Sequence, residues 1–229
     1  MSPSIPENLE KVRHQISRFE KKYARAEKSV QLIAVSKTHS ADKIREAYDA
    51  GQRDFGENYL QEALEKISQL SDLDITWHYI GPIQSNKTRA IAENFHWVHS
   101  VDRQKIAERL NDQRPDSLPP LNVLLQVNIS AETSKSGVTL NDLSSLVVAC
   151  KDLNNIILSG LMAIPAPSED FEQQKAAFHL LCDAKEKLVA LGFDQCLQLS
   201  MGMSRDFEAA IAEGATMIRI GTDIFGPRT

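Results

Sequence analysis

Hydrophobic and polar positions alternate along the chain in two patterns. Near the start, Leu9, Val12, Ile16 and Phe19 recur at three- and four-residue intervals among charges, which predicts a helix over about residues 7–23. Beyond it, short apolar runs typical of buried strands alternate with segments of helical spacing. The predicted strands cover residues 30–35, 54–56, 75–80, 97–101, 122–129, 156–162, 196–200 and 217–221. The predicted helices between and after them cover residues 41–50, 59–70, 87–94, 104–111, 140–153, 171–191 and 206–213.

This alternation predicts a parallel sheet, because a strand that returns parallel to its neighbour needs a crossover helix. About eight units, without a dinucleotide-binding Gly-x-Gly-x-x-Gly loop, favour a closed (β/α)8 TIM barrel over an open doubly wound sheet. No linker-like tract interrupts the pattern, so we expect residues 1–229 to form a single α/β domain with an extra N-terminal helix. Ser40 is expected to cap the helix over residues 41–50, and Gly51 to end it.

Composition and charge narrow the cellular setting. The 229 residues are 42% hydrophobic and 25% charged, which excludes a wholly disordered chain. A net charge of −5 argues against nucleic-acid binding, and no apolar run approaches the length of about 20 residues that a membrane span needs. The N-terminus lacks a secretory profile, and Cys150, Cys182 and Cys196 have no close spacing. We therefore expect a soluble cytoplasmic protein that binds neither nucleic acid nor membranes.

Lys37 is the first candidate for chemistry. It follows the apolar run over residues 32–35, at the carboxyl end of a predicted strand, where a barrel of this type carries its active site. Partial desolvation there would lower the pKa of the ammonium group and make the amine a nucleophile toward carbonyl carbons. Judged by position alone, a solvated surface lysine remains the alternative.

Two loops near the C-terminus have the composition of a phosphate site. Residues 200–206 connect a predicted strand to a helix, and residues 219–223 close the last strand. Phosphate sites in (β/α)8 barrels often use the loops after strands seven and eight, where glycine backbones approach the anion and hydroxyl groups donate to it. Ordinary turn chemistry in both loops is the alternative.

The remaining polar residues at predicted strand ends give weaker signals. Asn58 and His78 could line the same barrel mouth, the alternative for each being a buried side chain with satisfied hydrogen bonds. His96 and His99 lie three apart in a predicted strand and so face opposite sides of it. The other histidines have no ligand spacing, and we predict no metal site.

Several linked motifs resemble one family. Taken together, they resemble the pyridoxal phosphate homeostasis proteins, which are barrels that bind pyridoxal 5′-phosphate (PLP) and are related to the N-terminal domain of alanine racemases. The motifs occupy residues 34–38, 56–58, 61–62, 77–81, 84–87, 126–128, 135–137, 160–165, 199–204 and 219–226, in the order found in the family. The resemblance implies the fold-type III PLP barrel and PLP as cofactor.

The resemblance also implies how the matching residues hold the cofactor. Lys37 would bind PLP covalently as a Schiff base, an internal aldimine. Ser204, the backbone around Gly221 and the side chain of Thr222 would bind the phosphate, with Ser200 as a further donor. These assignments agree with the phosphate loops that the strand pattern indicates.

Two further residues would contact the ring of the cofactor. By resemblance, Asn58 would lie beside it and Arg219 would face its pyridine nitrogen. A guanidinium group offers only donors, so the nitrogen must accept and stays unprotonated. An unprotonated ring is a poorer electron sink, which disfavours the carbanion chemistry of aminotransferases.

The resemblance also bears on whether the protein is an enzyme. Racemases of this fold use a second acid/base group, a tyrosine from a second domain, and the sequence ends at Thr229 directly after the last predicted strand. We therefore expect that domain to be absent, and nothing assigns Tyr59 or Tyr79 as its substitute. This favours a monomeric, non-catalytic protein of vitamin B6 homeostasis that holds PLP and delivers it to PLP-dependent apo-enzymes. A PLP-dependent amino-acid racemase or lyase, or an aldolase-like barrel that binds a sugar phosphate on Lys37, are the alternatives.

Overall fold

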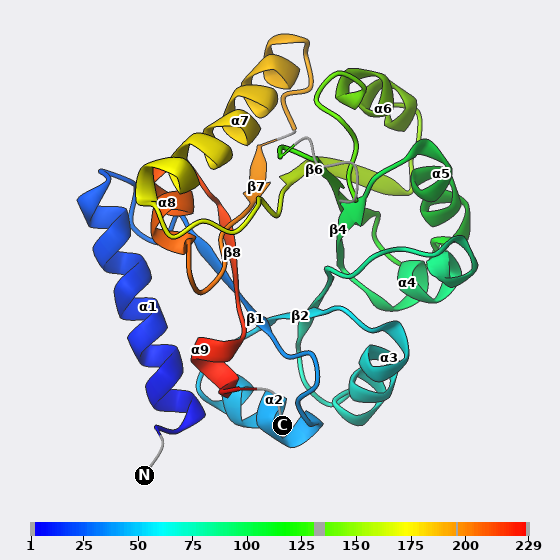
Figure 1. The fold of residues 1–229 in the computed structure, drawn as a ribbon. Helices are drawn as coiled ribbons and strands as arrows, with labels where there is room; N and C mark the ends of the chain where they lie inside the picture. Colours follow the sequence, from blue (N-terminus) through cyan, green and yellow to red (C-terminus); the bar gives the residue numbers. More distant parts are fainter. Residues whose placement is uncertain (1–2, 131–135, 196, 228–229) are drawn as a thin grey trace.

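The computed structural model describes residues 3–130, 136–195 and 197–227. Within them, eight parallel strands close into a barrel in sequence order, with the last strand beside the first (Figure 1). The strands are β1 (Gln31–Val35), β2 (Asp54–Glu57), β3 (Thr76–Tyr79), β4 (Trp97–Val101), β5 (Leu121–Gln126), β6 (Ile156–Met162), β7 (Gln198–Ser200) and β8 (Met217–Ile220). The predicted (β/α)8 barrel is confirmed.

Helices surround the barrel on the outside (Figure 1). They are α1 (Ile5–Lys22), α2 (Ala41–Asp49), α3 (Leu60–Gln69), α4 (Thr88–Asn94), α5 (Gln104–Gln113), α6 (Leu143–Cys150), α7 (Phe171–Ala190), α8 (Phe207–Ala212) and α9 (Thr222–Phe225), with a 3₁₀ turn η1 (Ser85–Lys87) before α4. None of the helices in the described ranges is long and apolar enough to cross a membrane.

The fifth strand ends earlier than the apolar run predicts. The run continues to Ile129, but β5 stops at Gln126 because the chain then turns to pair with a later loop. Val127 forms an isolated parallel bridge with Val138, and the backbone N–H of Asn128 donates to the carbonyl of Val138 at 2.9 Å. A partner eleven residues away in sequence thus overrides the local strand preference.

Helix ends show similar differences. Ser40 precedes α2 as predicted, but its side chain makes no capping hydrogen bond, so that prediction is wrong. The helix predicted over residues 140–153 is reduced to α6, since Thr139 and Asp142 hydrogen-bond to each other in a turn before it. The four-residue helix α9 is too short to leave a periodic signal in the sequence.

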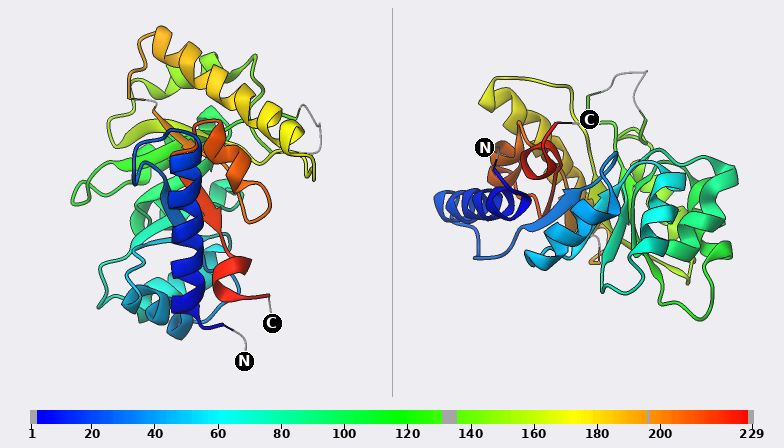
Figure 2. Two further views of the ribbon diagram at one scale, coloured as in Figure 1. Left: turned by 90° about the vertical axis from the view of Figure 1, so that its left-hand side faces the viewer. Right: turned by 90° about the horizontal axis from the view of Figure 1, so that it is seen from below.

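The N-terminal helix α1 is confirmed, and it begins two residues before the predicted start. Ser4 accepts from the N–H of Glu7, whose carboxylate accepts from the N–H of Ser4, which forms a capping box. Helix α1 runs along the outside of the barrel and packs against α2, α8 and α9 (Figure 2). The side chain of Asn8 donates to the carbonyl of Ile224 at 3.0 Å, which ties α1 directly to α9.

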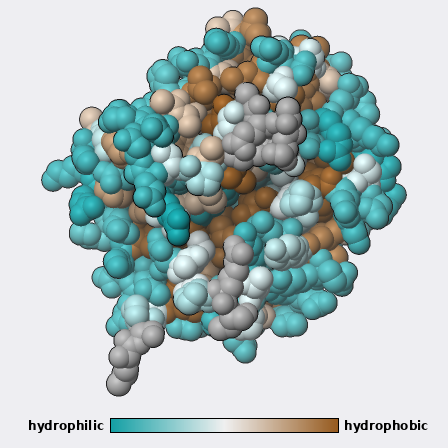
Figure 3. All heavy atoms as spheres, in the orientation of Figure 1, coloured by the Kyte–Doolittle hydropathy of each residue, from teal (hydrophilic) through white to brown (hydrophobic). Residues whose placement is uncertain are grey.

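The hydrophobic core has two parts. The larger part lies between strands and helices, and a small cluster of Ile33, Leu124, Met162 and Met217 forms a separate group of strand residues. The view of Figure 3 is that of Figure 1, and in it apolar residues gather around the centre of the face while hydrophilic ones cover its rim.

Candidate functional site

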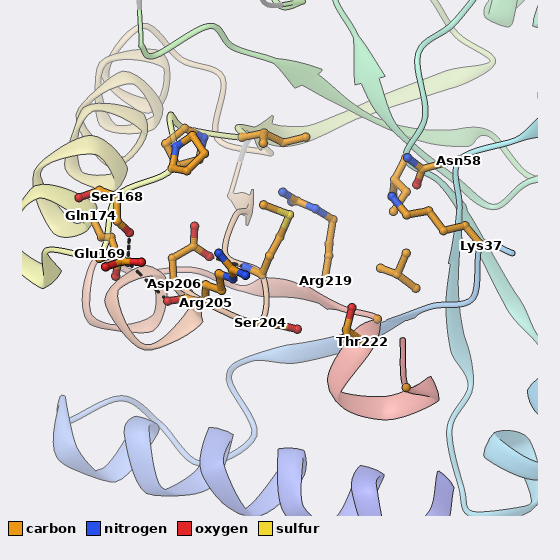
Figure 4. A pocket seen from close by; sticks show the side chains of 18 of the residues that line it. Lys37, Asn58, Ser168, Glu169, Gln174, Ser204, Arg205, Asp206, Arg219 and Thr222 are labelled. Atoms are coloured by element: carbon orange, nitrogen blue, oxygen red, sulfur yellow. Dashed lines mark hydrogen bonds between the residues drawn. The ribbon is translucent and has the colours of Figure 1, made fainter. Parts of the chain in front are cut away.

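A pocket of about 810 Å³ opens where the strands end. All six residues predicted to bind a cofactor line it (Figure 4), namely Lys37, Asn58, Ser204, Arg219, Gly221 and Thr222. They come from β8, from α9, from the junction between these two elements and from the segments that follow β1, β2 and β7. The sequence therefore predicted a set of residues that the fold does bring together.

The segment that carries Lys37 is fixed on both sides of the lysine. The hydroxyl of Ser36 donates to Oε1 of Glu57 at 2.6 Å, and the N–H of Thr38 donates to Glu62 at 2.6 Å. Thr38 has a φ of 67°, a left-handed conformation that is strained for a β-branched residue. These contacts aim the Lys37 side chain into the pocket, toward Asn58 (Figure 4).

A buried lysine lies beneath this segment. The ammonium of Lys66 donates to the carbonyl of Ser36 at 2.8 Å, to Glu57 at 2.7 Å, and also to Glu62. Burial raises the pKa of the Glu57 carboxyl, while the Lys66 charge and the Ser36 hydroxyl favour its ionised form. We call Glu57, Glu62 and Lys66 the ion cluster. In the sequence, the i,i+4 spacing of Glu62 and Lys66 predicts an ion pair on one helix, but it does not reveal that the lysine is buried.

Asn58 contributes an acceptor to the pocket. Its Oδ1 atom is buried and has no hydrogen-bond partner among the described residues. Glycine at position 81 lets the next loop approach, because a Cβ there would lie 2.0 Å from the carbonyl oxygen of Asn58. A buried acceptor without a partner is costly, so this atom is suited to a ligand donor.

The hydroxyl groups of Ser204 and Thr222 belong to neighbouring loops, because β7 and β8 are paired. Figure 4 shows both side chains below Arg219 at the edge of the pocket. Gly202, in the loop after β7, has a φ of 92°, and a Cβ added there would lie 2.6 Å from the Cβ of Ala210. Only glycine therefore lets this loop pack on α8. Gly221 precedes α9, whose first backbone N–H groups have no acceptor within the helix. Hydroxyl and backbone donors thus gather at one edge of the pocket.

Arg219 is buried at the inner end of the pocket. Its Nη1 donates to the hydroxyl of Ser200 at 2.6 Å, and its Nη2 donates to the carbonyl of Ala163 at 3.1 Å. Burial lowers the pKa of the guanidinium to about 10, although the charge of Asp206 opposes this, so it stays protonated at neutral pH. The Ser200 hydroxyl is engaged with Arg219 and is not among the lining residues, which differs from the phosphate contact expected for it.

Three other residues that could have lined the barrel mouth lie outside the pocket. His78 is fully buried below the pocket, where its ring bonds to Asp54, so the alternative of a satisfied buried histidine is confirmed. The hydroxyl of Tyr79 donates to the carbonyl of Pro82 at 3.1 Å, and Tyr59 is exposed. None of these three side chains lines the pocket in the described part of the chain.

Sequence reasoning missed the apolar part of the lining. It includes Ile164, Pro165 and Met203, of which the first two belong to a motif that resembles the family and the third lies in the loop after β7. Their apolar surface suits a flat ring, with polar groups at the two ends of the pocket. Asp206 also lines the pocket, and burial raises the pKa of its carboxyl.

Two sequence features bear on metals and thiols. No group of His, Cys, Asp or Glu in residues 3–130, 136–195 and 197–227 could hold a metal ion. Cys150 is buried in a helix, where desolvation raises the pKa of its thiol to about 11. Cys196 and Lys135, the lysine of the motif at residues 135–137, lie outside the described residues.

Comparison with known proteins agrees with this geometry. The alanine racemase N-terminal domain family matches residues 8–229. A pyridoxal phosphate homeostasis protein from Pseudomonas aeruginosa is 57% identical, over 98% of this chain and 96% of that protein. One from Escherichia coli is 51% identical, over 98% and 97%. The solved structure of PipY from Synechococcus elongatus with PLP bound aligns with a TM-score of 0.85 at 39% identity, covering 97% of this chain and 100% of that one. The chain therefore belongs to the pyridoxal phosphate homeostasis protein family, whose barrel is that of the alanine racemase N-terminal domain.

Proposed function

We propose that this protein binds PLP in the pocket and serves vitamin B6 homeostasis in the cytoplasm by holding and releasing the cofactor. The observation that carries the proposal is the convergence of Lys37, Arg219 and the two hydroxyl-bearing loops on one pocket of about 810 Å³. The relatives that carry the homeostasis name, and PipY with PLP bound, support it.

Each end of the pocket has a distinct role in this proposal. PLP supplies an aldehyde that condenses with a lysine amine, with loss of water. Lys37 would provide that amine and hold PLP as a Schiff base, and Asn58 would accept a hydrogen bond beside it. Arg219 would donate to the ring nitrogen, and since its guanidinium stays protonated, that nitrogen would remain an acceptor.

The direct test is the visible absorption spectrum of the purified protein with added PLP. We expect an imine band, its loss on borohydride reduction, and a reduced PLP adduct on the peptide that contains Lys37 in mass spectrometry. A colourless protein that takes up no PLP would overturn the assignment. Borohydride trapping with sugar phosphates alone would instead favour the aldolase-like alternative.

The phosphate role of Ser204 and Thr222 gives a second prediction. The variants Ser204→Ala and Thr222→Val each remove one donor to a charged group, which lowers PLP affinity about 10–100-fold. Affinity for pyridoxal, which lacks the phosphate, should stay unchanged in both variants. Equal losses for PLP and pyridoxal, measured by fluorescence titration, would place the phosphate elsewhere.

We propose that the protein does not turn over amino acids. Racemisation needs an acid/base group on each face of the substrate carbon, and neither Tyr59 nor Tyr79 lines the pocket. Asp206 is a carboxyl group in the pocket, but its Oδ1 accepts from the N–H of Met203 at 2.6 Å. We expect no exchange of α-protons with solvent deuterium above the background of Lys37→Ala across a panel of amino acids. Exchange that requires both Lys37 and Asp206 would establish the racemase or lyase alternative.

Delivery is the last part of the proposal. We expect the protein to act as a monomer that passes PLP to PLP-dependent apo-enzymes. Light scattering tests whether the protein is a monomer. For the transfer of PLP, we expect an apo-enzyme to regain activity faster with the loaded protein than with free PLP at the concentration that the protein releases spontaneously.

A further inference from the structure

Five polar side chains inside the barrel form one continuous row of hydrogen bonds that ends at Arg219. The hydroxyl of Ser200 lies 2.6 Å from Nη1 of Arg219 and 2.8 Å from Nδ1 of His99. Nε2 of His99 lies 3.0 Å from Nδ1 of His78. Nε2 of His78 in turn lies 3.0 Å from Oδ1 of Asp54. We call these five residues the buried row.

The buried row crosses the interior of the barrel. His99 belongs to β4 and Ser200 to β7, and these strands are not neighbours, so their contact spans the barrel. Asp54 is the first residue of β2, at the end of the barrel opposite the pocket, and its side chain is 21% exposed. Arg219 lies at the pocket itself. The row therefore connects a carboxylate at one end of the barrel with a guanidinium at the other.

The carboxylate of Asp54 makes every hydrogen bond in the row point the same way when both imidazoles are neutral. An ionised carboxylate can only accept, so His78 carries its proton on Nε2 and accepts at Nδ1. His99 must then carry its proton on Nε2 and donate to Nδ1 of His78. The bare Nδ1 of His99 accepts the single proton of the Ser200 hydroxyl, whose oxygen in turn accepts from Arg219, which can only donate.

The surroundings of the two rings fit this arrangement. Burial lowers the pKa of both imidazoles, although Asp54 opposes this for His78, so both rings are neutral as the row requires. His78 also stacks on Trp97 with ring centroids 5.8 Å apart, and Gln31 donates to Asp54 at 2.7 Å. Hydrogen bonds aligned in one direction in a low dielectric strengthen one another.

We propose that Asp54, His78, His99 and Ser200 are positioning residues that hold the guanidinium of Arg219 in one orientation from the far end of the barrel. Through them, Nη1 of the guanidinium stays bonded to Ser200 while Nη2 donates to the carbonyl of Ala163, so the group keeps one orientation at the pocket. The identity of the ligand as PLP rests on the proposed function, which this positioning role deepens. The direction of the row itself is a property of the protein without ligand.

The first experiment therefore uses the full-length protein without PLP. Two-bond ¹H–¹⁵N correlation spectra report which nitrogen of each imidazole carries the proton, and the single variants His78→Gln and His99→Gln assign the signals. We expect both rings at neutral pH to be protonated on Nε2 and bare on Nδ1. A proton on Nδ1 of either ring would overturn the proposal, whether or not the protein binds PLP.

The second experiment changes the far end of the row. In Asp54→Asn the side chain can both accept and donate, so this end no longer imposes a direction. We expect imidazole signals with a proton on Nδ1, and PLP affinity reduced about 2–30-fold, the range for residues coupled through a network. Asp74→Asn is the matched control, because Asp74 is an exposed aspartate just before β3 and is not in the row.

A pair of variants at the near end separates positioning from folding. Ser200→Ala removes the hydroxyl that joins Arg219 to His99, and Ser200→Thr keeps it. We expect the alanine variant to bind PLP more weakly than the threonine variant, although the two variants unfold at equal urea midpoints. Unchanged signals and affinity in Asp54→Asn would overturn the proposal. Shifted signals in a protein that binds no PLP would support the row and refute only the proposed function.

Discussion

Replacing Lys37 with alanine is expected to abolish both the imine band and the borohydride-stable adduct. Lys37 is the only lysine among the described residues that line the pocket, so the variant has no other amine there to condense with the aldehyde. The hydroxyl groups of Ser204 and Thr222 and the backbone around Gly221 remain in place. PLP should therefore still bind, reversibly and with the spectrum of the free aldehyde.

The control for this variant is Lys87→Ala. Lys87 lies in η1 within a motif that matches the family, but it is exposed and does not line the pocket. Its loss should leave the band, the adduct and the modified peptide unchanged. An adduct that persists in Lys37→Ala, recovered by mass spectrometry on a different lysine, would show that the pocket is not where PLP is held covalently.

The barrel could be predicted from the sequence because each β/α unit carries its own signal. Apolar runs such as residues 32–35 and 122–126 have the length and β-branching of buried strands, and helical spacing follows each of them. The prediction was wrong where a distant partner decides the local structure. The end of β5 is such a place, since the bridge from Val127 to Val138 is made by a loop that no periodicity reveals.

The candidate site likewise contains residues that could be predicted from the sequence and residues that could not. Lys37 and the two loops after β7 and β8 could be found because they follow strands directly, and parallel strands bring their carboxyl ends to one face. The buried row could not, because His99 and Ser200 meet across the barrel although they are 101 residues apart. A lone buried histidine in a sequence gives no sign of which strand it faces.

Lys37 and Arg219, which both line the pocket, are supported in a similar manner. Arg219 rests on the buried row, and the segment that carries Lys37 rests on the ion cluster of Glu57, Glu62 and Lys66. In both cases buried polar groups hold a residue that the pocket needs in one orientation. Preorganised side chains of this kind lose less entropy when a ligand binds.

The ion cluster yields the prediction with the largest effect on stability. In Lys66→Met the ammonium is removed, which leaves the buried carboxylate of Glu57 and the carbonyl of Ser36 without their donor. Breaking a buried ion pair by removing one partner destabilises a protein by about 3–5 kcal/mol. We expect that loss in the free energy of unfolding in urea, together with weaker retention of PLP, because the residues on both sides of Lys37 lose their anchors.

Two further variants isolate the cause. Lys22→Met makes the same change in an exposed pair, with Glu208 at 2.8 Å, and should leave the urea midpoint unchanged because water replaces the lost contact. Adding Glu57→Gln to Lys66→Met removes the uncompensated charge and should restore part of the lost stability. If Lys66→Met were no more destabilising than Lys22→Met, the cluster would not hold the Lys37 segment. A stability loss that the double variant does not reduce would point to lost packing of the lysine stem instead of the buried charge.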